Sequence, residues 1–175
     1  MQFVVAQLIS ISASLLTIFS FQFKKNSTLF IMQGIGALLF AISFAMLNVH
    51  TAAVLNLLNV FRGYIFAFSP KNIRTLLMIV LQLMYITATV LTFGGALSVL
   101  VMIAQIAGTL AMWSENGKII RLSQMLVVSP IWLINNILAK SIGGIFSDSF
   151  CIISSIVSIL RYGINGFETK SKAEN

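Results

Sequence analysis

Acidic residues are scarce in this sequence, which has four Asp and Glu residues against eleven Lys and Arg residues. Cysteine and histidine occur once each, as Cys151 and His50. A single cysteine excludes an intrachain disulfide and a CxxC metal site. The sequence also offers no paired carboxylates, no nucleophile elbow and no phosphate-binding loop. We therefore predict no enzyme activity, no catalytic or metal site and no cofactor.

Apolar residues dominate the sequence. They make up 58% of its 175 positions, and charged residues make up 9%, whereas soluble domains carry about 25% charged residues. Such a chain cannot cover its surface for water, so lipid is the expected solvent and the lipid bilayer the expected partner. The Lys and Arg residues are scattered singly or in pairs between apolar runs, which argues against a nucleic-acid surface.

The apolar runs divide into seven segments of membrane-spanning length, about 20 residues each. The breaks between them carry charges, a proline, paired glycines or other polar residues, as at Asn48–Thr51, Pro70, Gly94–Gly95 and Lys140. The predicted spans are residues 2–22, 28–48, 51–68, 75–93, 95–113, 119–139 and 142–161. The chain is thus predicted to be an all-α, multi-pass integral membrane protein.

The distribution of Lys and Arg predicts the orientation of these spans. If seven helices alternate in direction, ten of the eleven cations fall on one side of the membrane, and only Lys140 falls on the other. Loops rich in Lys and Arg stay in the cytoplasm. The sequence therefore predicts that the N-terminus lies outside and the C-terminus in the cytoplasm.

The chain also resembles itself after a shift of 91 residues. This shift places 21–27 on 112–118 and Gln33 on Gln124, and it matches the order of three helices and their loops. The fourth helix then restores the orientation that direct duplication of three helices would invert. We predict a 3+1+3 arrangement of two parallel three-helix bundles, 1–68 and 94–162. A loop and linker helix at 69–93 join them, and a cytoplasmic tail follows at 163–175.

Several short motifs carry a family resemblance. They are Trp132, Ile134 and Asn136 before Ser141-Ile142-Gly143-Gly144, then Asp148 and Arg161, and in the first half Asn59-Val60-Phe61-Arg62. Over essentially the whole chain, the sequence resembles the YgjV-type bacterial inner-membrane family, which implies a bacterial inner (cytoplasmic) membrane location. That family is similar in plan to the SWEET and PQ-loop transporters of sugars and amino acids.

The sequence departs from the larger SWEET and PQ-loop group at its proline positions. Where that group has a Pro-Gln pair, this chain has Met32-Gln33 and Ser123-Gln124. Only Pro130 lies inside a predicted span, where it removes a backbone hydrogen bond and can form a hinge or a static kink. The proline hinges that the resemblance implies are therefore largely missing.

Two charged residues in predicted spans are candidates for a binding site. Asp148 is the only acid within a span and lies about 10 Å along the seventh helix from its outer end. A charge there is costly and usually faces a partner or a wet cavity. Arg62 on the third helix tilts toward the same level. One hypothesis is an Arg62–Asp148 ion pair that joins the repeats. The other is that Arg62 reaches the inner headgroups and Asp148 is protonated or near an outer vestibule.

Polar side chains at helical spacing complete the set of predicted solute-binding residues. The full set is Asn56, Asn59, Arg62, Trp132, Asn136, Asp148, Ser154 and Ser158. In SWEET-like proteins a Trp and an Asn contribute to the pocket, so the resemblance implies that role for Trp132 and Asn136. The same amides and hydroxyls also hold membrane helices together through interhelical hydrogen bonds, and that interpretation stays open.

The sequence favours a carrier for a small polar solute that works by alternating access between the two bundles. One alternative is a membrane-embedded solute-binding subunit of a larger transporter. Another is a structural or regulatory membrane protein with a closed core and no transport. The sequence names no solute and leaves assembly into a homo-oligomer open.

Overall fold

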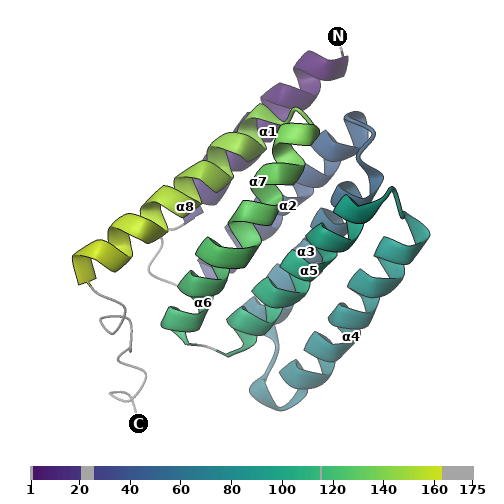
Figure 1. Ribbon diagram of the computed structural model, residues 1–175. Coiled ribbons are helices and arrows are strands. Elements are labelled where there is room, and N and C mark those ends of the chain that lie inside the picture. Colours follow the sequence, from purple (N-terminus) through teal and green to yellow (C-terminus); the bar gives the residue numbers. More distant parts are fainter. Residues whose placement is uncertain (1, 21–25, 115, 163–175) are drawn as a thin grey trace.

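The chain folds into a helical bundle in the computed structural model, which describes residues 2–20, 26–114 and 116–162 (Figure 1). Its elements are α1 (Gln2–Ser20), α2 (Asn26–Met46), α3 (His50–Phe68), α4 (Lys71–Leu91), α5 (Ala96–Trp113), α6 (Gly117–Ser123), the π-helix η1 (Gln124–Val128), α7 (Ser129–Leu138) and α8 (Ile142–Tyr162). Because α6, η1 and α7 follow one another without a break, the described residues form seven rods. The predicted all-α fold is confirmed.

The helix boundaries follow the breaks predicted from the sequence. Pro70 caps α4, and Gly95 caps α5 with a φ of 118°, a conformation that glycine adopts without strain. Residues 23–25 of the first predicted break and the whole predicted tail, 163–175, lie outside the described residues. Each described rod begins and ends within about four residues of its predicted span.

The outside of the bundle is apolar and much of its inside is polar. Leu91 and Leu160 are 79% and 80% exposed, whereas Ser10 and Asn135 are 0% and 2% exposed. A water-soluble protein has the reverse distribution. Four described segments are long and apolar enough to cross a membrane: Gln2–Ser20, His50–Phe68, Asn72–Leu91 and Ala96–Trp113. Crossing by all seven rods stays a prediction.

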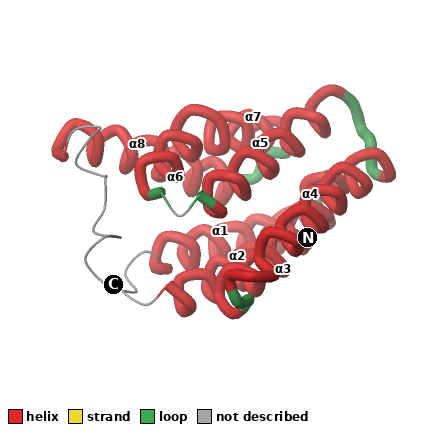
Figure 2. Tube along the Cα trace, turned by 90° about the horizontal axis from the view of Figure 1, so that it is seen from below, coloured by secondary structure: helices red, strands yellow, loops and turns green. Residues whose placement is uncertain are grey.

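The helices form two layers, which Figure 2 shows one above the other. One layer contains α1, α2 and α3, and the other contains α5, the α6–η1–α7 rod and α8. The layers meet where α1 packs on α8 and where α3 packs on α5, while α4 packs on both α3 and α5 at one edge. We call the end of the bundle where α1 begins the upper end, as drawn in Figure 1, and the opposite end the lower end.

Two turns at the upper end have the same backbone structure. In the turn between α2 and α3, Val49 N–H donates to the Phe44 carbonyl and Asn48 N–H to the Ala45 carbonyl. In the turn between α7 and α8, Ser141 and Lys140 make the equivalent bonds to the Asn136 and Ile137 carbonyls. Asn48 and Lys140 adopt φ angles of 60° and 55°. These are Schellman motifs, each ending its helix with a left-handed residue.

Close polar contacts join the two layers at the upper end. The Gln7 side chain of α1 donates to the Lys140 carbonyl (2.7 Å) and accepts from Ile142 N–H (2.8 Å). Gly143 N–H donates to Ser10 Oγ (3.2 Å), and a Cβ on Gly143 would overlap the Ser10 backbone. On the other side, the Thr51 hydroxyl of α3 lies 3.0 Å from the Ser98 hydroxyl of α5. The layers therefore touch backbone to backbone near Gly143.

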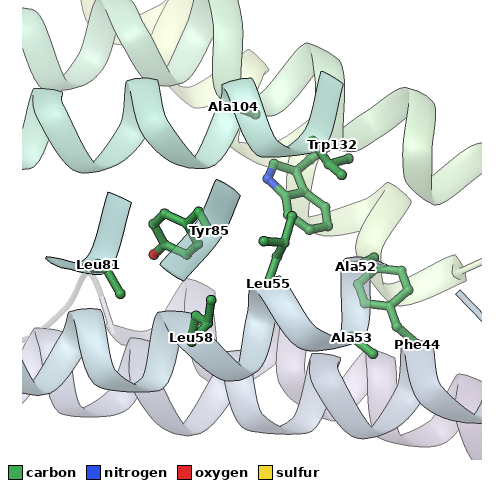
Figure 3. Packing of buried hydrophobic residues seen from close by; sticks show 10 residues of the cluster. Phe44, Ala52, Ala53, Leu55, Leu58, Leu81, Tyr85, Ala104 and Trp132 are labelled. Carbon is green, nitrogen blue, oxygen red and sulfur yellow. The ribbon is translucent and has the colours of Figure 1, made fainter. Parts of the chain in front are cut away.

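The hydrophobic core also lies toward the upper end and connects the layers. Phe44 of α2, Leu55 of α3, Tyr85 of α4 and Trp132 of α7 are each less than a tenth exposed and belong to one cluster. Figure 3 shows Trp132 reaching down from its layer toward Leu55. Burial of several large side chains in one cluster contributes roughly 1.5–3 kcal/mol for each in water, and less in a bilayer, where close packing replaces the hydrophobic effect.

Candidate functional site

A cavity of about 710 Å³ lies between the two layers. Seven of the eight predicted binding residues line it, namely Asn56, Asn59, Arg62, Trp132, Asn136, Asp148 and Ser154. The eighth, Ser158, lies on α8, and its side chain is outside the described part of the structure. The structure thus brings together residues from α3, α7 and α8 that the sequence identified separately.

The cavity extends from the buried upper half of the bundle to its lower end. Its upper lining residues Asn56, Trp132 and Asn136 are at most 8% exposed. Its lining continues to Met112, where α5 finishes, and to Ile120 near the beginning of α6, and both are partly exposed. Since α5 ends and α6 begins at the lower end, the cavity is accessible from that end.

Aromatic rings close the upper part of the cavity. The ring of Trp132 lies 5.9 Å from the ring of Phe44, and Phe44 lies 6.2 Å from Phe40, measured between ring centroids. All three residues line the cavity, and Trp132 and Phe44 also belong to the hydrophobic core. The rings therefore separate the cavity from the packed upper end of the bundle.

The amides of α3 are held by neighbouring groups. Asn56 donates to the Ala52 carbonyl (2.9 Å), and Asn59 accepts a hydrogen bond from the Tyr85 hydroxyl (2.8 Å). Both side chains are 7% exposed. Each Asn amide can make more hydrogen bonds than these. Asn59 thus links α3 to α4 through an interhelical hydrogen bond and also lines the cavity.

Arg62 crosses from α3 to α5. Its Nη1 donates to Gln105 Oε1 (3.2 Å) and lies over Gly108. Thr51 and Ser98 fix the relative depth of the two helices. At a rise of about 1.5 Å per residue, Gln105 lies about 10 Å below Ser98 along α5, and the Arg62 backbone lies about 16 Å below Thr51 along α3. The Arg62 side chain therefore runs back toward the upper end, as its tilt predicted.

Asp148 is bound by the amide of Asn136. Asn136 Nδ2 donates to Asp148 Oδ2 (2.7 Å), a charge-assisted hydrogen bond if the carboxyl is ionised. The Asn136 side chain fills the space where a Cβ on Gly144 would lie. Asn136 Oδ1 is buried and has no hydrogen-bond partner. Gly144 is therefore what allows Asn136 to reach Asp148.

The predicted Arg62–Asp148 ion pair is not formed. No nitrogen of Arg62 lies within 4.0 Å of a carboxylate oxygen of Asp148, and each binds a neutral amide instead. Arg62 and Asp148 line the same cavity without contacting each other. The other hypothesis for Arg62, extension to the headgroups, is also wrong because its guanidinium turns toward Gln105.

The comparisons with known proteins assign the chain to a family. The family model Imp-YgjV, described as a bacterial inner membrane protein, matches residues 4–165. The chain belongs to the YgjV family. Comparison with curated proteins and with solved structures found no match. The predicted family and the inner-membrane location are thus confirmed, and the relationship to SWEET and PQ-loop transporters stays a prediction.

Sequence reasoning missed several cavity residues of this YgjV-family chain. Gln105, Gln33, Gln124 and Cys151 also line the cavity. Gln105 could have been found, because it is one of two amide residues in the long uncharged run from Thr75 to Trp113. Gln33 and Gln124 were aligned by the 91-residue shift but were not assigned to the site.

The chemistry available in the cavity is that of recognition. Its lining combines amides, hydroxyls, one guanidinium, one carboxylate and an aromatic wall, which is the mixture that fixes the orientation of a small polar molecule. Within 2–20, 26–114 and 116–162, no three His, Cys, Asp or Glu side chains come together to hold a metal ion. In the YgjV-family chain, these groups can therefore bind a polar solute through hydrogen bonds and charge.

Proposed function

We propose that the chain is a carrier for a small polar solute that alternates access between two three-helix bundles, with the cavity as its binding site. The observation that carries this proposal is the position of the cavity between the two helix layers. It is closed at the upper end by aromatic rings and accessible at the lower end. A site enclosed between two bodies and open on one side is what alternating access requires of one state.

Correspondence between the two halves of the lining supports the proposed repeat. Residues of α2 and α3 that line the cavity have counterparts 92 positions later that also line it. The pairs are Phe40 and Trp132, Phe44 and Asn136, Asn56 and Asp148, Asn59 and Cys151, and Arg62 and Ser154. The two Schellman turns at the upper end are also offset by 92 residues. Both sets of pairs favour the 3+1+3 arrangement.

The π-helix explains why the offset is 92 after it and 91 before it. Gln33 and Gln124, and Ala37 and Val128, both line the cavity and are 91 residues apart. A π-turn holds one residue more than an α-turn. The single turn at Gln124–Val128 therefore accounts for the extra residue in the second half.

The distribution of charge supports a cytoplasmic opening. The first turns of α4 and α6, which begin at the lower end, contain Lys71, Arg74 and Lys118, whereas Lys140 is the cation of the turn at the upper end. Loops rich in Lys and Arg remain in the cytoplasm. We therefore place the lower end in the cytoplasm and describe the structure as an inward-open state of the carrier.

The cavity also weighs against the closed-core alternative. A structural or regulatory protein has no need of a cavity of about 710 Å³ that is lined by amides, hydroxyls and two ionisable groups, since polar side chains at membrane depth are costly. Transport by the isolated chain distinguishes a carrier from a solute-binding subunit of a larger transporter.

The test is uptake by the purified chain in liposomes. Vesicles would be given a mixture of labelled sugars, amino acids and carboxylic acids, with protein-free vesicles as the blank. Saturable uptake of at least one solute is expected, together with counterflow when the same unlabelled solute is loaded inside. If the chain binds a solute but takes it up only after an ATPase is added, the result would support the binding-subunit alternative and contradict the proposal.

A further inference from the structure

The two ionisable groups of the cavity have no partner of opposite charge. Arg62 and Asp148 are the only Asp, Glu, Lys or Arg side chains among the described lining residues, and each is hydrogen-bonded to a neutral amide. Single charges at membrane depth are costly unless they meet an opposite charge or water. Both charges face one cavity, so a single bound molecule can neutralise both of them.

Both groups lie below the contacts that join the two layers at the upper end. Asp148 is five residues past Gly143, about 8 Å below the turn that contacts α1, and the Arg62 guanidinium lies near Gln105, about 10 Å below the Thr51–Ser98 contact. The Arg62 guanidinium lies at α5 and the Asp148 carboxyl on α8. A ligand that reaches both groups therefore extends through the cavity from Gln105 of α5 to Asp148 of α8.

We infer that the cavity takes a small zwitterion, whose anionic group binds Arg62 and Gln105 and whose cationic group binds Asp148. This inference rests on the proposed function and names the class of solute. A neutral sugar would leave both charges unpaired, and a simple anion or cation would leave one unpaired. A zwitterion pairs both through charge-assisted hydrogen bonds, which are about twice as strong as neutral ones.

The experiment measures binding to the purified full chain by calorimetry. The probes are ω-amino carboxylates from glycine to 6-aminohexanoate, the alkylamine and the alkanoate of each chain length, and glucose. At least one zwitterion is expected to bind, with its amine and its carboxylate at least about tenfold weaker. The best chain length then reports the distance between the two charges. Equal binding by glucose or by a singly charged probe, or no binding by any zwitterion, would overturn the inference.

Variants assign each charge to its residue. Arg62→Gln is expected to lower the affinity for the zwitterion to that of the alkylamine, and Asp148→Asn to that of the alkanoate. Lys140→Gln removes a positive charge from the exposed upper turn and is expected to leave the affinity unchanged. Unchanged zwitterion affinity in folded Arg62→Gln and Asp148→Asn would contradict the assignment. If either variant fails to fold, the wild-type probe series alone decides.

Binding and uptake separate the two proposals. A zwitterion that binds but is not taken up would contradict the carrier and support the ligand class. Saturable uptake of a neutral sugar, with no zwitterion binding, would support the carrier and contradict the ligand class.

Discussion

Two adjacent glycines have different tasks at the start of α8. Gly143 lets the α8 backbone approach α1, because any Cβ there would overlap the Ser10 backbone. Gly144 leaves room for the Asn136 side chain, which binds Asp148. Backbone cannot give way, whereas a side chain can change rotamer. The two positions should therefore respond differently to a methyl group.

Gly143→Ala is expected to destabilise the protein by about 2 kcal/mol or more, because α8 must move away from α1. Thermal unfolding in detergent measures the change as a lower Tm. Gly94→Ala is the matched control, since a Cβ there meets only Ser98 Oγ at an ordinary 3.7 Å. A Tm for Gly143→Ala equal to that of Gly94→Ala would contradict the close approach.

Gly144→Ala is expected to displace Asn136 and to break its hydrogen bond to Asp148. Replacing Asn136 by Ala as well removes the clash, so the effects on stability should not add. We expect the double variant Gly144→Ala/Asn136→Ala to be more stable, by about 1 kcal/mol, than the sum of the single changes predicts. A double-mutant cycle of unfolding free energies measures this coupling, and strict additivity would mean that the two residues do not touch.

At this scale the sequence predicted which residues meet but not how they pair. Asn56, Arg62 and Asp148 were identified because polar residues are rare in the spans and can be recognised from the sequence alone. The partner of each depends on the rotation of the helices about their axes. Gln105 on α5 and Asn136 on α7 are closer to the two charges than the charges are to each other, and hydropathy carries no such information.

The π-helix before α7 has a local cause in Pro130. Proline has no N–H and its ring collides with the carbonyl four residues earlier in an α-helix. Here Ser129 N–H donates to the Gln124 carbonyl, five residues back, and this widens the turn just before the proline. Gln124 also donates to the Ser129 hydroxyl (2.9 Å). The extra residue thus relieves the proline and aims Gln124 at the cavity wall.

Deletion of Val127 is expected to convert η1 into an α-helical turn and to force the Pro130 ring against a carbonyl, at a cost of about 3 kcal/mol. Combining the deletion with Pro130→Ala should recover most of that stability, because the register of α7 is then kept without the clash. Thermal unfolding measures both. Deletion of Ile79 in the regular helix α4 is the control, and Pro130→Ala should not rescue it. Equal instability with and without Pro130→Ala would show that the π-turn has another cause.

Element boundaries were largely predictable, and the π-helix was not. Charges, Pro70 and the Gly94–Gly95 pair end helices by local chemistry, so the sequence predicted the rods closely. One extra residue inside an apolar run leaves no mark on hydropathy. Pro130 indicated a kink in the sixth span, and the structure shows a widened turn there.

At the scale of the whole molecule, an odd number of membrane crossings is expected, with the lower end of the bundle in the cytoplasm. Fusions of alkaline phosphatase and green fluorescent protein test this, because the first is active only outside the inner membrane and the second fluoresces only inside. Phosphatase activity is expected at the N-terminus and fluorescence at the C-terminus. Both termini in one compartment would contradict the topology. The 3+1+3 arrangement expected from the repeat stays a prediction, and the opening of the cavity was not predictable because it depends on side-chain packing between the layers.

Cys151, the single cysteine of the chain, lines the cavity and can report from which side of the membrane the cavity is open. A membrane-impermeant methanethiosulfonate reagent would be applied to inside-out and right-side-out vesicles, with Cys151→Ser as the blank. We expect the reagent to modify Cys151 rapidly from the cytoplasmic side and much more slowly from the outside. Gln7→Ala removes the contacts of α1 with Lys140 and Ile142 at the upper end, so it should accelerate modification from the outside. Modification from the outside alone, or from neither side, would contradict a cavity that opens to the cytoplasm between two moving halves.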